Sequence, residues 1–368
     1  MKIAVLYNTS EYLLRFRSEL MKSLVDAGHE VVAITPVDSE TPRLSGLNVR
    51  WLEWKLAGQA VNPIKDIESM LDLRKILIDE RPDAILNFTI KPAIYGSLVA
   101  SFVGVPRIVS MITGMGSLFL QGGVMRNLLL TLIKTLYRLA MRRNHSVLFQ
   151  NDEDFDYFVQ SRFIVREKGR RINGSGVNLE LFSSRSQSVR VGSFLLISRM
   201  IKEKGIFEFI EAARKIKLIY PKAHFTLVGP IDSNPGAISL AQIRAWEREG
   251  VVDYAGVQSD VRPFLESADV YVLPTYYFEG VPRSILEALA MGKPIITTDW
   301  RGCRDTVVPN VNGFLIRPKD SDELAFAMKK FLENSSLSPV MGVESRRLAE
   351  NKFNVVTVND IVIRELTS

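Results

Sequence analysis

The chain has 368 residues, of which 46% are hydrophobic and 24% charged, and its formal net charge is +6 with a pI of about 9.3. This length exceeds what a single core usually supports, and the composition excludes a disordered or fibrous chain. The lone cysteine, Cys303, excludes an internal disulfide and suits a reducing cytosol. No apolar run approaches the ~18 residues of a membrane-spanning helix.

The basic charge is compatible with nucleic acid, phosphorylated ligands or an anionic membrane as partner. Aromatic residues do not alternate with the basic ones, as single-stranded nucleic-acid binding favours. We therefore predict no nucleic-acid partner.

Short β-branched runs alternate with amphipathic patterns in the first half of the chain. The runs predicted as strands are 2–7, 30–36, 83–88, 107–113 and 145–150. The helical patterns lie near 11–27, 65–80, 92–103 and 124–142. Because the first run stops at Asn8, it indicates a strand and not a signal peptide. The alternation predicts an α/β domain with a doubly wound parallel sheet.

The same alternation restarts in the second half. Strands are predicted at 192–198, 224–229, 251–256, 269–274 and 294–299, and helices near 205–219, 237–248, 282–291 and 320–333. The turn-rich stretch 173–192 separates the two halves. We predict domains at 1–178 and 179–353, and a last helix near 354–368 that packs back on the first domain. Ligands of such domains bind at the carboxyl ends of the strands.

Two glutamates follow the predicted strand 269–274. Glu279 lies in the strand-to-helix loop, and Glu287 lies on the helix that begins around Pro282 and ends before Gly292. One interpretation is that these carboxylates bind hydroxyl groups of a ligand. The alternative is structural, with Glu287 paired to a lysine and Glu279 solvated in the loop.

The start of this helix is also a candidate site for phosphate. The backbone N–H groups of Arg283, Ser284 and Ile285 would point out of the helix N-terminus, which carries a partial positive charge. A carboxylate for hydroxyls beside a helix start for phosphate suits a nucleotide sugar.

Two cations follow the first strand of the second domain, in the segment SRMIKEKG. Arg199 and Lys204 lie at the carboxyl edge of the predicted sheet, before a helix that opens at Gly205. Fixed cations at this place can bind a diphosphate and stabilise it as it leaves. Basic loop residues are commonly solvated, so the argument depends on both segments meeting at one sheet edge.

The segments ISRMIKEKG, GSGVNLELF, FEGVPRSILEALAMGKPIITTD and GCRDTVVPNVNGFLI resemble those of the retaining glycosyltransferases of family 4, which have the GT-B fold. Glu279 and Glu287 match the E-x7-E motif of that family, and Arg199 and Lys204 match its diphosphate-binding pair. The resemblance implies that Glu279 contacts the transferred sugar and Glu287 the ribose. It also implies that the donor is lined by Gly280, Val281 and Ser284. The second domain would then bind the nucleotide sugar.

The first domain resembles a subgroup that extends lipid-linked O-antigen, capsule or glycan repeat units. The resemblance rests on the stretch 87–119 and on GQAVNP at 58–63, and it implies that Lys91, Thr113 and Gly114 lie on the acceptor side. Many relatives carry paired glycines in the first loop, where this chain has NTSEYLL. Backbone contacts to phosphate are therefore not expected from that loop.

Residues Asp152-Glu153-Asp154 form a D-x-D sequence, which binds a divalent metal in other glycosyltransferase folds. Here it opens a predicted helix, where acidic residues are favoured by capping and by the helix dipole. Because Arg199 and Lys204 supply positive charge, we predict no metal and no cofactor other than the nucleotide-sugar substrate.

The helix 124–143 is basic and amphipathic. Four cations fall on one half of the helical wheel and five apolar residues on the other: Arg126, Lys134, Arg138 and Arg142 against Leu128, Leu129, Leu132, Ile133 and Leu136. Such a helix binds an anionic bilayer or covers a sheet. The first helix adds Arg15, Arg17 and Lys22. The membrane interpretation predicts a cytoplasmic enzyme attached peripherally to the inner face of the cell membrane.

Together these features predict retaining transfer of a hexose or N-acetylhexosamine, UDP-linked, to a polyprenyl-diphosphate-linked saccharide. Two alternatives stay open. A UDP-sugar epimerase would turn over the donor without an acceptor, and it usually requires a catalytic carboxylate or histidine pair that the sequence does not show. A non-catalytic nucleotide-sugar-binding or membrane scaffold subunit would bind the donor without transfer.

Overall fold

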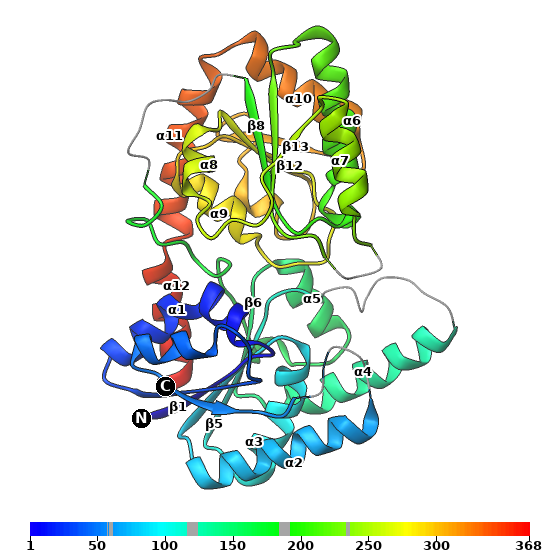
Figure 1. The fold of residues 1–368 in the computed structure, drawn as a ribbon. Helices are drawn as coiled ribbons and strands as arrows, with labels where there is room; N and C mark the ends of the chain where they lie inside the picture. Colours follow the sequence, from blue (N-terminus) through cyan, green and yellow to red (C-terminus); the bar gives the residue numbers. More distant parts are fainter. Residues whose placement is uncertain (57, 59–61, 116–123, 184–191, 233–235) are drawn as a thin grey trace. The chain divides into compact units, whose positions relative to one another are not determined.

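The computed structural model of the protein describes residues 1–56, 58, 62–115, 124–183, 192–232 and 236–368. The chain divides into two compact units (Figure 1). Unit 1 comprises Met1–Ser175 and Val355–Ser368, and unit 2 comprises Gly176–Asn354. Much of the stretch 173–192 that we predicted to join the halves lies outside the described residues.

Unit 1 is built on a sheet of seven parallel strands in the order β3-β2-β1-β4-β5-β6-β7. The strands are β1 Lys2–Leu6, β2 Glu30–Thr35, β3 Arg50–Glu53, β4 Ala84–Phe88, β5 Arg107–Ile112, β6 Ser146–Phe149 and β7 Gly169–Arg171. All residues of the central β4 are buried, as in parallel strands covered on both faces. The strand order reverses between β1 and β4.

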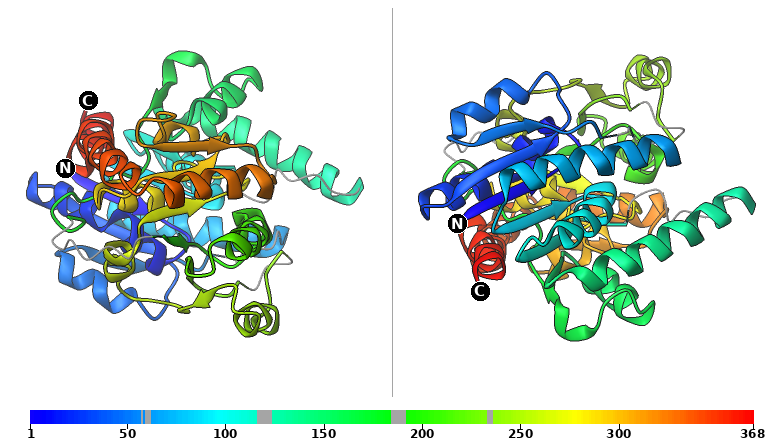
Figure 2. Two further views of the ribbon diagram at one scale, coloured as in Figure 1. Left: turned by 90° about the horizontal axis from the view of Figure 1, so that it is seen from above. Right: turned by 90° about the horizontal axis from the view of Figure 1, so that it is seen from below.

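Helices cover both faces of this sheet (Figures 1 and 2). The helices of unit 1 are α1 Ser10–Asp26, α2 Pro63–Glu80, α3 Ser97–Val103, α4 Val124–Arg143, α5 Asp152–Gln160 and α12 Val355–Thr367. A π-helical turn, Pro92–Gly96, precedes α3, and 3-10 turns lie at Thr41–Leu47 and Arg166–Lys168. α12 packs beside α1, where Asn359 Nδ2 donates to Ser23 Oγ at 3.1 Å. The last helix thus lies on unit 1.

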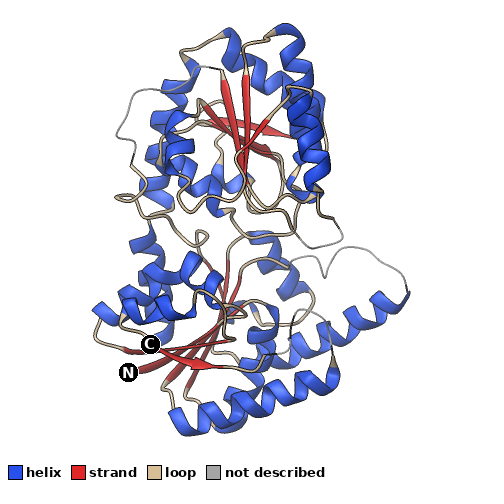
Figure 3. Cartoon of the chain, in the orientation of Figure 1, coloured by secondary structure: helices blue, strands red, loops and turns tan. Residues whose placement is uncertain are grey.

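Unit 2 repeats the architecture, with helices packed around a central sheet (Figure 3). Its six strands are parallel and lie in the order β10-β9-β8-β11-β12-β13. The strands are β8 Ser193–Ile197, β9 His224–Val228, β10 Asp253–Tyr254, β11 Val270–Leu273, β12 Ile295–Thr298 and β13 Gly313–Ile316. The helices are α6 Ile206–Ile219, α7 Leu240–Arg248, α8 Arg262–Ser267, α9 Arg283–Ala290, α10 Ser321–Glu333 and α11 Leu337–Lys352, with 3-10 turns at Lys202–Lys204 and Arg304–Thr306. Here the strand order reverses between β8 and β11.

The predicted fold class, two doubly wound parallel sheets, is confirmed. Five elements were not predicted: β3, β7, β13, α8 and α11. α11 contains Gly342, whose position leaves no room for a side chain because an added Cβ would lie 2.3 Å from the carbonyl oxygen of Gly292. Within the described residues, no helix combines the length and the apolar character needed to cross a bilayer.

Candidate functional site

The predicted donor-side residues of unit 2 lie where its strand order reverses. Arg199 follows β8, and Lys204 ends the 3-10 turn Lys202–Lys204 just before α6. Glu279 lies in the loop after β11, the strand that pairs with β8. Carboxyl ends on either side of such a reversal form the usual ligand-binding edge of an open α/β sheet.

Lys204 and Glu279 form a direct ion pair. The Lys204 ammonium donates to Glu279 Oε1, and the Thr275 hydroxyl donates to the same oxygen at 3.3 Å. The two side chains are only 10% and 19% exposed, so the attraction between them is weakly screened. The family resemblance implies separate roles for these residues, and the structure places them in contact.

The turn that carries Lys204 is fixed against the end of β11. Gly205 has φ +76°, and a Cβ at this position would lie 2.2 Å from the Pro274 carbonyl oxygen, so a larger residue does not fit. The Tyr276 backbone N–H donates to the Glu203 carbonyl at 2.8 Å. The Lys204 side chain therefore projects from a rigid turn.

Arg199 is held by an aspartate that the sequence did not indicate. Arg199 Nη1 donates to Asp232 Oδ2 at 2.7 Å, and the Asp232 side chain is 8% exposed. Asp232 follows β9 in the segment VGPID, which carries no recognisable motif. This segment is bonded to the Arg199 loop, because the Met200 N–H donates to the Pro230 carbonyl at 2.9 Å. Both predicted cations therefore already face a carboxylate.

The start of α9 differs from the prediction by one residue. Pro282 is the N-cap, with φ −64° and ψ 121°, and the helix begins at Arg283. The Ile285 N–H donates to the Pro282 carbonyl at 3.1 Å, so the prediction that Ile285 offers a free N–H is wrong. The N–H groups of Arg283 and Ser284 remain at the helix end, and within the described residues no side chain caps it.

Glu287 lies on α9 and pairs with an arginine of the same helix. Arg283 Nε donates to Glu287 Oε1 at 2.9 Å, and both side chains are less than one-fifth exposed. The structural alternative predicted that Glu287 pairs with a lysine, and this is wrong because its partner is Arg283. The i, i+4 spacing of Arg283 and Glu287 is the sequence signal that would have found it.

Gly280 and Val281 are both buried, and the Val281 side chain packs in the core of unit 2. Gly302, with φ +73°, lies against them, because a Cβ there would be 2.1 Å from the Gly280 carbonyl oxygen. The neighbouring Cys303 is also buried, and burial raises the pKa of its thiol to about 12. This thiol stays protonated near neutral pH and is not a nucleophile.

In unit 1, the predicted acceptor-side residues follow two adjacent strands. Lys91 comes after β4, and Thr113 and Gly114 come directly after β5, which pairs with β4. Lys91 Nζ donates to Asp66 Oδ1 at 2.8 Å and to the Gly58 carbonyl at 2.7 Å. Its side chain is 14% exposed, so the ammonium is held by the protein.

The strand-order reversal of unit 1 carries two polar residues that the sequence analysis did not single out. Asn8 lies in the loop after β1, and Thr89 directly follows β4, the strand that pairs with β1. Asn8 Oδ1 and Thr89 Oγ1 are buried and have no hydrogen-bond partner among the described residues. Thr89 also has φ +63°, which is strained for a β-branched residue. Buried orphan groups and strain of this kind mark candidate ligand contacts.

The N-terminus of α1, which follows β1, is closed by the protein itself. The N–H groups of Ser10 and Glu11 donate to Asp38 Oδ2 at 2.7 and 3.0 Å, and the Tyr12 N–H donates to Thr9 Oγ1 at 3.1 Å. A carboxylate therefore occupies the position that phosphate takes at a helix start. This agrees with the absence of paired glycines from the first loop.

The D-x-D sequence opens α5, as predicted. Asn151 is the N-cap and accepts from the Asp154 N–H at 2.7 Å, and Asp152 forms an ion pair with Arg171 at 3.1 Å. Over the described ranges, no group of three or more His, Cys, Asp or Glu side chains is arranged to hold a metal ion.

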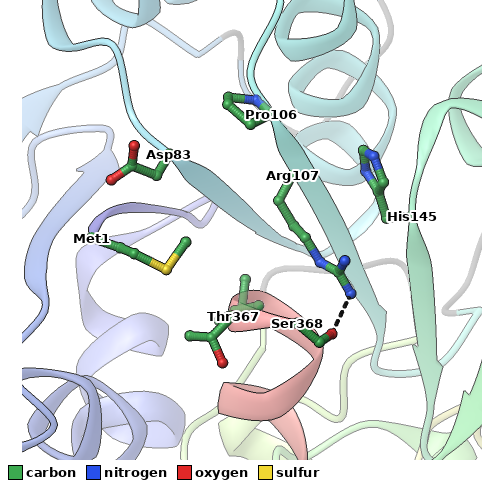
Figure 4. Close-up of a pocket in the computed structure, with 8 residues that line it drawn as sticks. Met1, Asp83, Pro106, Arg107, His145, Thr367 and Ser368 are labelled. Atoms are coloured by element: carbon green, nitrogen blue, oxygen red, sulfur yellow. Dashed lines mark hydrogen bonds between the residues drawn. The ribbon is translucent and has the colours of Figure 1, made fainter.

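A hollow of about 650 Å³ lies at the opposite, amino-terminal edge of the unit 1 sheet (Figure 4). Asp83, Arg107 and His145 line it, each next to the start of a strand, together with the end of α12. Arg107 Nε donates to the Glu365 carbonyl at 2.8 Å, and its Nη2 donates to Ser368 Oγ at 2.8 Å. These contacts anchor α12, so we assign this hollow a structural role.

Comparison with known proteins matches each half of the chain to a family model. Residues 192–334 match the model described as glycosyl transferases group 1, and residues 2–151 match the model described as glycosyl transferase 4-like. A similar relative is the Campylobacter jejuni N,N'-diacetylbacillosaminyl-diphospho-undecaprenol alpha-1,3-N-acetylgalactosaminyltransferase, with 29% identity over 92% of this chain and 91% of the relative. Another is the Escherichia coli UDP-Gal:alpha-D-GlcNAc-diphosphoundecaprenol alpha-1,3-galactosyltransferase, with 26% identity over 80% and 78%.

Solved structures show the same fold. The crystal structure of Anabaena Alr3699/HepE in complex with UDP and glucose superposes with a TM-score of 0.81 at 18% identity, over all of both chains. Sucrose-phosphate synthase from Thermosynechococcus elongatus gives a TM-score of 0.80 at 17% identity, over 99% of this chain and 98% of the other. The chain therefore has the GT-B fold and belongs to the group 1 and 4-like glycosyl transferases.

Proposed function

We propose that this glycosyltransferase transfers a hexose or N-acetylhexosamine, with retention, from a UDP-sugar to a polyprenyl-diphosphate-linked saccharide. The observation that carries the proposal is the contact of Lys204 with Glu279 at the strand-order reversal of unit 2, with Arg199 on the same edge. A cation for the diphosphate and a carboxylate for the sugar lie side by side, as they must when one bond joins the two parts of the donor.

The relatives support the acceptor class. Both names given above specify a saccharide on diphospho-undecaprenol, and both specify an alpha linkage. An alpha product from an alpha-linked donor corresponds to retention. The complex of UDP and glucose with Anabaena Alr3699/HepE, a protein of the same fold, supports UDP as the nucleotide.

The proposed reaction breaks the bond between the sugar anomeric carbon and the diphosphate oxygen. The acceptor hydroxyl forms a bond to the same carbon from the same face, and its proton passes to the leaving phosphate, so no protein base is required. Arg199 and Lys204 stabilise the negative charge on the leaving diphosphate. Glu279 orients the sugar, Glu287 binds the ribose, and Gly280, Val281 and Ser284 line the donor.

We propose further that no metal is needed. The two cations and the open start of α9 supply the positive potential that a divalent ion provides elsewhere. Glu279 must release Lys204, at least in part, when the donor binds. Glu279 and Asp232 balance the positive charges of Lys204 and Arg199, and the donor phosphates would replace them.

The test is product formation from UDP-glucose, UDP-galactose, UDP-GlcNAc and UDP-GalNAc with diphosphoundecaprenol-linked GlcNAc and diacetylbacillosamine, in EDTA. We expect one donor to give an alpha-linked product without added metal. Donor conversion without acceptor would indicate the epimerase alternative, and donor binding with no transfer would indicate the non-catalytic alternative. Activity restored only by a divalent ion would overturn metal independence.

We also propose that the enzyme is cytoplasmic and attached to the inner face of the membrane by unit 1. On α4, the side chains of Arg126, Leu128 and Leu129 lie outside the described residues. Ile133 is buried, as expected of a helix that covers the sheet, whereas Leu132 is 49% exposed and is available to a membrane surface. Arg17, which we placed on the basic surface of α1, is 4% exposed and lies over Phe88.

The neighbouring α2 strengthens this surface. It exposes an apolar row, and Phe102 of α3 is 75% exposed beside Arg74. The exposed apolar residues of α2 are Ile64, Ile67, Leu71 and Ile78. α2 packs on α3, and α3 packs on α4, whose last turn carries Arg142 and Arg143. Apolar residues beside basic ones suit an anionic lipid surface.

Flotation with vesicles of neutral and anionic lipid tests this attachment. Ile67→Asp/Leu71→Asp should reduce binding to anionic vesicles, whereas Val340→Asp/Val343→Asp on the exposed face of α11 should not. Equal binding of wild type to neutral and anionic vesicles would contradict the proposal.

A further inference from the structure

Tyr277 brings the two predicted diphosphate cations onto one aromatic ring. Arg199 Cζ and Lys204 Nζ each lie 5.6 Å from the centroid of the Tyr277 ring. Both distances fall within the ~6 Å over which a cation is attracted to the face of an aromatic ring. The two cations come from the loop after β8, and the ring comes from the loop after β11.

The backbone around Tyr277 is fixed on both sides. The Tyr277 N–H donates to Thr275 Oγ1 at 3.1 Å, and its carbonyl accepts from the Glu279 N–H at 3.0 Å and from Trp300 Nε1 at 3.2 Å. Thr275 Oγ1 also donates to the Glu203 carbonyl at 3.1 Å, next to Lys204. The loop that carries the Tyr277 ring is therefore hydrogen-bonded to the turn that carries Lys204.

The ring differs from the other partners of these cations in one respect. Asp232 and Glu279 are carboxylates, so they compete with phosphate for Arg199 and Lys204. The Tyr277 ring is neutral, and contact with its face leaves the N–H donors that point away from it available to phosphate. The contact with the ring is thus compatible with the binding of phosphate to both cations.

We infer that Tyr277 is a positioning residue that holds Arg199 and Lys204 in the arrangement that binds the donor diphosphate. This inference rests on the proposed function, in which these cations bind the diphosphate. Because Tyr277 acts through the cations, its loss should weaken ligands with a diphosphate more than ligands with one phosphate. A purely structural role in the loop would weaken both to the same extent.

The experiment measures the dissociation constants of UDP and UMP, in EDTA, by calorimetry. Tyr277→Leu removes the ring, and Tyr277→Phe keeps it without the hydroxyl. Tyr276→Leu is the matched control in the same loop, because its ring contacts Lys319, at 4.8 Å, instead of the two cations. Tyr277→Met replaces Tyr277→Leu if thermal unfolding shows that the leucine variant does not fold.

We expect Tyr277→Leu to weaken UDP about tenfold and UMP by less than about threefold, since two cation–π contacts are lost. Tyr277→Phe and Tyr276→Leu should keep the preference of the wild type for UDP. The inference is overturned if Tyr277→Leu keeps that preference, or if Tyr277→Phe loses it equally. If the wild-type protein binds neither UDP nor UMP, the proposed donor site itself is wrong.

Discussion

The two strand-order reversals of this protein share one topology but differ in electrostatic character. In unit 2, the loop after β8 presents Arg199 and Lys204, and α9 begins at Arg283 with no side-chain cap among the described residues. In unit 1, the helix after β1 is capped by Asp38, and the neighbouring Asn8 and Thr89 are uncharged. The edge in unit 2 offers cations and the start of α9 to an anion, whereas in unit 1 Asp38 already accepts from the N–H groups at the helix start.

The difference supports the proposal that unit 2 binds the nucleotide. A helix start binds phosphate only while its N–H groups are available, and Asp38 occupies those of α1. The orphan oxygens of Asn8 and Thr89 can instead accept hydrogen bonds from hydroxyl groups. This is the chemistry that an acceptor saccharide requires.

Among the variants considered, Lys204→Ala should cause the largest loss of activity. Without the cation that stabilises the leaving diphosphate, we expect kcat to fall by roughly 100- to 1,000-fold. Glu287→Ala should act mainly on the donor KM, because Glu287 is assigned to the ribose. Lys202→Ala, in the same turn but 56% exposed, is the control. Comparable kcat values for Lys204→Ala and Glu287→Ala would contradict the division of roles.

Glu279→Gln should distinguish the contact with the sugar from the contact with the diphosphate, because it should lower kcat without weakening UDP binding. We expect kcat to fall by about 10- to 100-fold as the sugar loses its orienting carboxylate. The affinity for UDP should stay the same or increase, because Lys204 loses the carboxylate that competes with phosphate. Calorimetric titration with UDP checks this, and weaker UDP binding in Glu279→Gln would show that Glu279 does not compete.

Asp38→Ala tests the role of the carboxylate that caps α1 in unit 1. Removing the carboxylate that accepts two N–H groups of α1 should lower the free energy of unfolding by about 1–2 kcal/mol. It should leave the affinity for UDP unchanged. Asp26→Ala, at the other end of α1, should not destabilise the protein, because an acidic residue is unfavourable at a helix C-terminus. A large change in UDP affinity in Asp38→Ala would place the nucleotide in unit 1.

Charge pairs at the amino-terminal edge of unit 1 should affect stability only, and this is the smallest expected effect. The hydrogen bond from Arg50 lowers the pKa of Glu80 in the folded state. Since the folded pKa lies below the unfolded one, the stabilisation is complete above the unfolded pKa and is lost as the pH falls through the folded pKa. The free energies of unfolding of wild type and Glu80→Gln should therefore differ most above about pH 5 and become equal in acid. A difference that does not vary with pH would contradict this.

The sequence predicted the strands that are nearly continuous apolar runs, such as β4 and β11. It missed β3 and β7, which are short edge strands of mixed polarity, and α11, whose apolar pattern is interrupted by Pro339 and Gly342. Local patterns do not report such elements, because their stability comes from the neighbours on which they pack.

The sequence predicted only those site residues that lie in recognisable motifs. Lys204 and Glu279 stand in recognisable segments, and the structure brings them together. Asp232 and Tyr277 could not be found in this way, because each acts through a contact made across loops that are distant in sequence. Arg283 could have been found from its spacing to Glu287.

The proposed donor site requires that the cations at the strand-order reversal of unit 2 bind the nucleotide diphosphate without a metal. Calorimetric titration of UDP in EDTA into wild type, Lys204→Ala and Lys202→Ala tests it most directly. We predict binding by wild type and Lys202→Ala, and a loss of affinity of about tenfold or more in Lys204→Ala. Equal affinity of the three proteins, or binding that returns only with a divalent ion, would contradict the claim.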